Sequence, residues 1–87
     1  MIATKPTTQA VSGALRRANL AAPATKCGAE VWVFLRYTTR NNARAIYTAL
    51  DVLCKARGWA LTGSVADGAL WDMVSVSLTI SEAEAQP

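Results

Sequence analysis

The middle of the chain, residues 31–57, reads VWVFLRYTTRNNARAIYTALDVLCKAR and carries the strongest secondary-structure patterns of the sequence. Its first part alternates with a period of two, which is typical of a β-strand, and we expect that strand at residues 29–37. The alternation places two sets of side chains on opposite faces: Val31, Val33, Leu35 and Tyr37 on one, and Trp32, Phe34 and Arg36 on the other. Both faces are largely apolar, so either both are covered or one of them is a binding face.

The second part of this stretch predicts an amphipathic helix at residues 41–57. Apolar residues recur every three or four positions, which gathers them on one stripe of a helix. The stripe consists of Ala43, Ile46, Tyr47, Leu50, Leu53 and Cys54. Gly58 follows directly and favours the left-handed conformation in which helices commonly end.

On the N-terminal side of residues 31–57, the sequence predicts a shorter helix at residues 7–20. Val11, Ala14, Leu15 and Ala18 recur at helical spacing, and Thr7 or Thr8 could cap the start. Residues 21–28 have no clear period and are interpreted as a connector.

On the C-terminal side, the sequence predicts a hairpin of two strands, at residues 59–65 and 70–80. The turn is expected at Ala66-Asp67-Gly68, because Asp-Gly supplies the backbone conformation of tight turns. In the last strand the residues expected in the core are Val74, Val76, Leu78 and Ile80. The polar, acidic residues 81–87 are expected to fray.

These elements predict a small α+β two-layer sandwich of order α-β-α-β-β. Two helices would pack on a three-stranded sheet, mixed or antiparallel, within one domain at residues 1–80. After a crossover through the second helix, a hairpin often places the last strand in the centre of the sheet. A chain of 87 residues is too short for two independent cores.

The composition argues against an enzyme. The sequence contains no His, which removes the usual proton shuttle and the His-based nucleophile pairs and metal sites. Its two cysteines cannot complete a tetrahedral zinc site, and its five glycines never take phosphate-loop spacing. We therefore expect no catalytic residue, no metal and no cofactor.

The apolar segments are short. The longest uninterrupted aliphatic and aromatic run is Val31 to Leu35, against about 20 residues needed to cross a bilayer. The first residues contain no apolar segment of the kind that signal peptides carry. We therefore expect a cytoplasmic protein with no membrane partner and with reduced thiols.

Charge is distributed unevenly along the chain, and this favours an anionic partner. Residues 1–57 carry all nine basic residues against two acidic ones, a net charge of +7, whereas residues 58–87 carry −4. Such asymmetry indicates an anionic partner for the first part, unless folding interleaves the two parts and cancels the field.

Basic residues concentrate at the expected start of the second helix. Three arginines oppose the usual preference of a first helical turn for acids, and a phosphate would relieve that conflict. The candidate anion-binding residues there are Arg36, Arg40, Asn41 and Arg44, and Arg16 and Arg17 form a second basic cluster on the first helix. The alternative is that these side chains are simply solvated.

A second candidate site is the sheet face that carries Arg36. It also bears Trp32, Phe34, Trp71 and Met73. Three interpretations stay open: the first helix covers this face and makes it core, the face is an interface with a protein or a second copy, or its aromatics stack nucleobases.

The sequence thus predicts a small non-catalytic binding module. The leading hypothesis is a nucleic-acid-associated accessory or regulatory protein that contacts phosphates through the Arg-rich helix start. The alternative is a protein-interaction module that uses the aromatic face, such as a homodimerising adaptor or inhibitor of the kind that phages and mobile elements encode.

Overall fold

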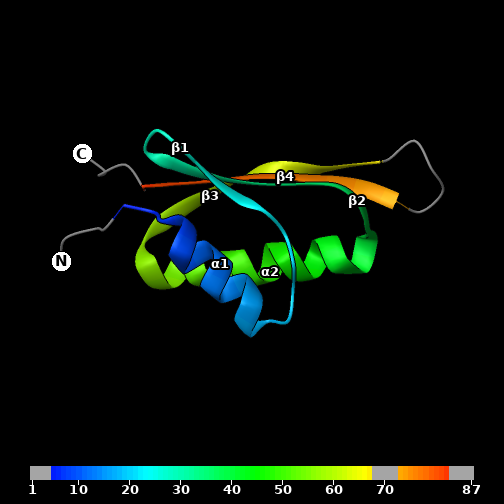
Figure 1. Ribbon diagram of the computed structural model, residues 1–87, viewed down its shortest axis with the longest axis horizontal. Coiled ribbons are helices and arrows are strands. Elements are labelled where there is room, and N and C mark those ends of the chain that lie inside the picture. The colour runs from blue at the N-terminus through cyan, green and yellow to red at the C-terminus, as the bar shows by residue number, and fades with distance from the viewer. Residues whose placement is uncertain (1–4, 68–72, 83–87) are drawn as a thin grey trace.

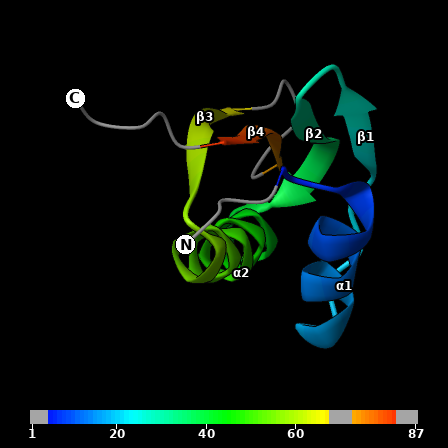
Figure 2. The ribbon, with the colours of Figure 1, turned by 90° about the vertical axis from the view of Figure 1, so that its left-hand side faces the viewer.

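The computed structural model describes residues 5–67 and 73–82, which form two layers (Figure 1). The elements in chain order are α1 (Thr8–Arg17), β1 (Ala24–Cys27), β2 (Glu30–Thr39), α2 (Arg40–Arg57), β3 (Trp59–Asp67) and β4 (Met73–Glu82). The strands form one antiparallel sheet of order β1-β2-β4-β3. Both helices lie on the same face of this sheet (Figure 2). The expected α+β class with two helices is therefore confirmed.

The sheet has four strands, so the prediction of three was wrong. The additional strand, β1, lies inside the expected connector and pairs with the start of β2, from Ala24 opposite Val33 to Cys27 opposite Glu30. A tight turn joins the two strands, with Gly28 at φ 62°. The four residues of β1 are too few to show a period, and the pairing with β2 defines the strand. The last strand, β4, does lie between β2 and β3, as expected.

Helix α1 is shorter than predicted because its C-terminus is closed by a specific turn. Thr7 caps the start, where its hydroxyl accepts a hydrogen bond of 3.1 Å from the Ala10 N–H. At the other end Asn19 takes φ 60°, and the Leu20 N–H donates to the Leu15 carbonyl at 2.8 Å. This bond from the second residue beyond the cap is typical of a Schellman motif, and it ends the helix at Arg17.

Helix α2 matches the predicted amphipathic helix at both ends. Thr39 caps the start by accepting from the Asn42 N–H at 3.1 Å, and Gly58 ends the helix at φ 74°. Most of the predicted stripe is buried, namely Ala43, Ile46, Leu50, Leu53 and Cys54. Tyr47 is the exception, because it is 44% exposed. It lies beside the edge strand β3, where no further described strand extends the sheet over its ring.

The core lies between the helices and one face of the sheet. Both helices contribute to it, with Val11 and Leu15 from α1 and the stripe of α2. The sheet contributes Val31, Val33, Trp59, Val74, Val76, Leu78 and Ile80. The predicted alternation of β4 is thus confirmed.

Two expectations about the C-terminal part need correction. Ala66 and Asp67 are strand residues, with Asp67 opposite Val74, so the turn does not lie at Ala66-Asp67; Gly68 falls outside the described residues. Ser81 and Glu82, expected in the tail, are paired with β3 at the end of β4. Residues 83–87 lie outside the described part of the chain.

Candidate functional site

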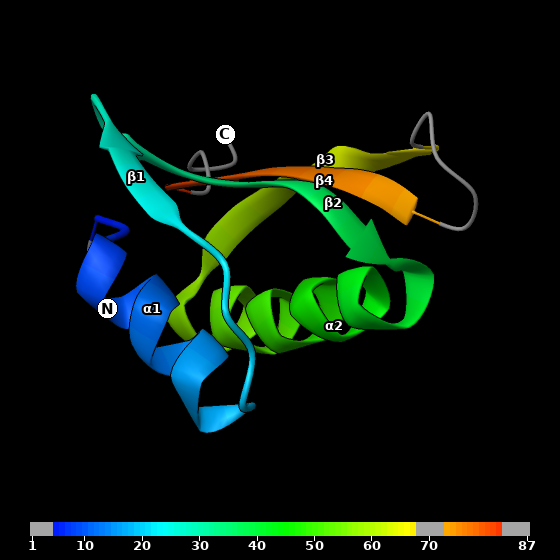
Figure 3. The same cartoon turned by 45° about the vertical axis from the view of Figure 1, so that its right-hand side comes forward.

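The face of the sheet opposite the helices, called the open face here, is not covered by any element of residues 5–67 or 73–82. Figure 3 shows both helices below the sheet and no helix on its other side. Trp32 and Phe34 point to this side, and each is 48% exposed. The interpretation of these two residues as core under the first helix is therefore wrong, because α1 packs on the other face.

The cross-strand neighbours of the two aromatic rings are polar but uncharged. Trp32 lies opposite Thr79 of β4 and Thr25 of β1, and Phe34 lies opposite Ser77. Trp32, Val33, Phe34, Ser77 and Thr79 together line a shallow hollow in the open face. Side chains two residues apart on one strand are separated by about 6.7 Å, so the rings stand as neighbours along β2.

A β-bulge interrupts the regular alternation of side chains near the end of β2. Leu35 pairs with Val76 and Thr38 with Val74, so Arg36 and Tyr37 together oppose Ser75. The Ser75 hydroxyl donates to the Arg36 carbonyl at 2.7 Å. The extra residue reverses the alternation: Thr38 is buried, and Tyr37 is 53% exposed. The prediction that Tyr37 shares a face with Val31 was wrong for this reason.

The bulge produces a line of three exposed aromatic side chains on one strand, which we call the aromatic row: Trp32, Phe34 and Tyr37. Arg36, also exposed, lies within the row. At the opposite end, the Trp32 Nε1–H donates to the Glu30 carboxylate at 3.1 Å. Glu30 and Tyr37 were not among the predicted site residues, although the i, i+2 spacing of Glu30 and Trp32 on a strand would have indicated their contact.

The arginines at the start of α2 are all exposed, but the structure does not gather them into one cluster. Arg40 and Arg44 line a hollow beside β3 together with Ala43, Tyr47 and Val65. Asn41 points to the other flank, where it and Arg44 line a groove next to Leu20. Arg44 thus borders both hollows, and Asn41 and Arg40 lie on opposite sides of it.

The start of α2 is held by two side chains that are not basic. Thr38, which is buried, accepts a hydrogen bond of 2.6 Å from the Asn42 side-chain amide. With the Thr39 cap, this contact fixes the turn between β2 and α2. It also fixes the separation between Arg36 at the end of the open face and Arg40 at the start of the helix.

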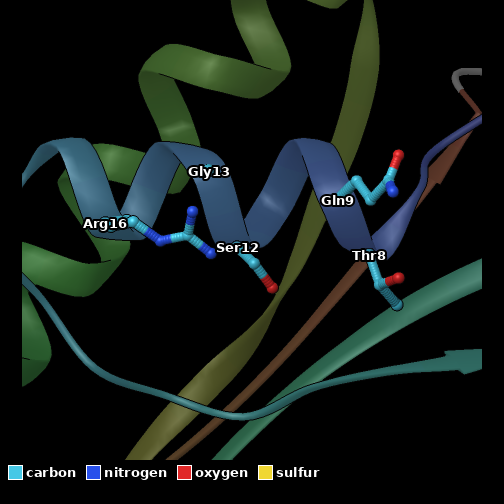
Figure 4. A pocket seen from close by; sticks show the side chains of 5 residues that line it. All are labelled: Thr8, Gln9, Ser12, Gly13 and Arg16. Carbon is cyan, nitrogen blue, oxygen red and sulfur yellow. The ribbon is translucent and has the colours of Figure 1, made fainter.

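The second basic pair, Arg16 and Arg17, lies in the last turn of α1 on the helix side of the sheet. Arg16 borders a hollow on α1, and Figure 4 shows its side chain extended along the helix toward Ser12. The Arg17 guanidinium lies near Gly13, where a Cβ would stand 3.6 Å from its Nη1. These two arginines therefore face away from the aromatic row.

The remaining predicted residues are placed as follows. By the alternation of β4, Met73 lies on the open face and is half-buried. Trp71 falls outside the described residues.

Cys27 is exposed and Cys54 is buried. Burial, with a smaller effect of the Asp51 carboxylate, raises the pKa of the Cys54 thiol to about 11, so it stays protonated at neutral pH.

The described part of the chain offers neither a metal-binding cluster nor a membrane-spanning helix. No group of three or more His, Cys, Asp or Glu residues there is arranged to hold a metal ion. Neither α1 nor α2 combines the length and the apolar character that a bilayer-spanning helix needs. Comparison with known proteins gives no match to a family model or to a curated protein.

Proposed function

We propose that this protein binds single-stranded nucleic acid on its open face. The observation that supports the proposal is the aromatic row, whose three side chains are each about half exposed on a sheet face that no described element covers. Leaving such apolar rings in water is unfavourable, and burying them against a ligand is a source of affinity.

Stacking would supply the contacts to the bases. Four-stranded sheets with helices behind them bind single-stranded RNA by stacking two or three bases on exposed aromatic side chains. The spacing of Trp32 and Phe34, about 6.7 Å along the strand, suits neighbouring bases of an extended strand. The hydroxyls of Ser77 and Thr79 line the same hollow and are available as hydrogen-bond partners for base edges.

Arginines near one end of the row would supply the contacts to the phosphates. Arg36 lies within the row, and Arg40 and Arg44 follow where the chain turns into α2. Glu30, at the far end of the row, repels phosphates, so the backbone of the ligand is expected to lie toward the Arg36 end. In this proposal Arg16 and Arg17 contribute only long-range attraction, because they lie on the helix side.

A second candidate function is a protein-interaction module, and the polarity of the open face favours it. Most positions around the rings are uncharged hydroxyl residues, including Thr25, Ser75, Ser77 and Thr79. Aromatic residues among neutral neighbours are typical of the centre of a protein interface. In that case a protein partner, or the open face of a second copy, would cover the aromatic row.

Titration of labelled single-stranded RNA and DNA by fluorescence anisotropy at several salt concentrations tests the first function. Three arginine–phosphate contacts predict a slope of about −2 in log K against log salt. Phe34→Ala should weaken binding by roughly 5- to 100-fold, the effect of losing one stacked base.

Matched arginine variants provide the control. Arg36→Ala should lower the slope by about 0.7, whereas Arg16→Ala should change it much less. Equal effects of the two variants would refute the placement of the site on the open face. Absence of binding at low salt would refute the function, and self-association that resists high salt but is lost in Phe34→Ala would support the second candidate.

A further inference from the structure

We propose that two copies of this chain associate edge to edge through β3, which joins their sheets into one sheet of eight strands. This inference does not depend on the proposed nucleic-acid binding, because it concerns a different surface of the molecule. It rests on the exposed edge of β3, on its sequence and on the apolar side chains beside it.

The two edges of the sheet differ in how they are protected. Edge strands expose unpaired backbone N–H and C=O groups, and proteins commonly protect them by short length, Lys or Pro. β1 has four residues, contains Lys26 and follows Pro23. β3 has nine residues, and among the described residues it pairs only with β4. Residues 60–66, ALTGSVA, include no charge and no Pro, so this stretch of the edge lacks those protections.

The sequence of β3 is complementary to itself in the antiparallel direction. When Gly63 of one copy lies opposite Gly63 of the other, Thr62 faces Ser64, Leu61 faces Val65 and Ala60 faces Ala66. These three pairs each join residues of the same chemical kind: two hydroxyls, two aliphatic side chains and two alanines. A two-fold interface requires this property, because each patch must be complementary to itself.

The side chains next to this edge are apolar and incompletely covered. Val65 is 45% exposed although it lies opposite the buried Val76 on the helix side of the sheet. Tyr47, 44% exposed, lines the same hollow as Val65. In the proposed register Leu61 of the second copy lies directly opposite Val65 and removes it from water, at about 5 Å between Cβ atoms.

The symmetry of this pairing has a consequence for the open face. The two-fold axis stands perpendicular to the sheet, so the helices of both copies lie on one side and both open faces on the other. Five strand intervals then separate the two β2 strands, which places the two aromatic rows about 24 Å apart. One assembly would present both rows on a continuous surface.

Sedimentation velocity over a concentration range of about 1 to 100 μM tests the proposal in the absence of nucleic acid. The unmodified chain should form a dimer. Val65→Lys should weaken the dimer at least tenfold, because a charge on the strand edge opposes pairing. Val52→Lys is the matched control, since Val52 is 63% exposed on α2, and it should leave the dimer intact. A monomer throughout this range would overturn the proposal, and so would equal weakening of the dimer by Val65→Lys and Val52→Lys. A dimer that is lost in Phe34→Ala and kept in Val65→Lys would also overturn it.

Cysteine cross-linking provides a test that does not require Val65→Lys to fold. In a Cys27→Ser background, Thr62→Cys and Ser64→Cys are made in separate chains and mixed under mild oxidation. The buried, protonated thiol of Cys54 does not compete. The register predicts a disulfide between the two different chains, because residues 62 and 64 lie opposite each other. If each variant alone cross-links as strongly as the mixture does, the register is wrong. If the mixture does not cross-link at all, the edge pairing is wrong.

Discussion

Gly63 of β3 lies so close to Leu78 of β4 that a Cβ at position 63 would stand 2.8 Å from the Leu78 Cα. The same Cβ would also meet the Ser77 carbonyl oxygen. Gly63 has φ 143°, a conformation that side chains other than glycine rarely adopt. The contact with β4 and the backbone conformation both exclude a side chain in the middle of the edge strand.

Gly63→Ala should therefore destabilise the protein by about 2 to 4 kcal/mol, since the conflict is with backbone atoms that cannot rotate away. Urea unfolding followed by circular dichroism measures the change. Gly28→Ala is the control: Gly28 has φ 62° but nothing within 4 Å of its Cβ position, so only the left-handed conformation costs about 1 kcal/mol. Equal losses of stability in the two variants would show that β3 and β4 are not packed this closely.

The contact between Trp32 and Glu30 gives a prediction for ligand affinity. Glu30→Gln keeps an oxygen that can accept from the Trp32 Nε1–H but removes the negative charge next to the row. Single-stranded nucleic acid should then bind roughly threefold more tightly at low salt, and the gain should shrink as salt rises. Anisotropy titration of the two forms side by side measures this. An unchanged affinity would mean that phosphates do not approach this end of the row.

The hydrogen bond between Thr38 and Asn42 predicts coupling between the bulge and the start of α2. Thr38→Val and Asn42→Ala each remove one partner of a bond of 2.6 Å at a largely buried position. In a double-mutant cycle the two changes should be coupled by about 1 kcal/mol in the free energy of unfolding. Purely additive losses would indicate that water replaces this bond without cost.

The two cysteines should react very differently with an alkylating agent at neutral pH. Cys27 is exposed, whereas Cys54 is buried in the core. Mass spectrometry after a short treatment of the folded protein should find Cys27 modified and Cys54 intact, with Cys54 reacting only after denaturation. Rapid modification of Cys54 in the folded protein would contradict its place in the core.

The raised pKa of Cys54 also predicts a loss of stability at alkaline pH. In the folded state the thiol titrates near pH 11, against an ordinary value of 9.0. The unfolded chain thus releases its proton first, and the free energy of unfolding should fall as pH rises from 9 to 11, by about 2 to 3 kcal/mol in total. Cys54→Ala should show a smaller fall over the same window, because the thiol is gone. Parallel curves for the two proteins would show that burial of the thiol is not responsible.

Local sequence patterns were sufficient for most of the secondary structure. Thr7 and Gly58 mark real helix boundaries, and the alternation of β4 correctly identifies its buried residues. A helix cap depends on interactions between residues a few positions apart. The alternation of β4 requires only that some apolar surface covers one face of the strand. A single sequence carries that information directly.

The candidate site was only partly predictable. Trp32, Phe34 and Arg36 were correctly placed on one side of their strand, but the alternation could not show whether a helix covered that side. Only the packing of α1 against α2 and β1 leaves the open face uncovered. Tyr37 joined the row through the bulge between Leu35 and Thr38, which shifts the register of β2 against β4.

Sequence patterns were enough to locate two helices, the caps Thr7 and Gly58, and the strands β2 and β4, and the composition showed that histidine chemistry is absent. Three features depend on tertiary contacts: Ala24–Cys27 is a strand, β3 is an exposed edge, and Tyr47 and Val65 stay half exposed beside it. The difference lies in the range of the interactions. Capping and periodicity act within one turn or one strand, whereas pairing, bulges and burial depend on segments that are distant in the chain.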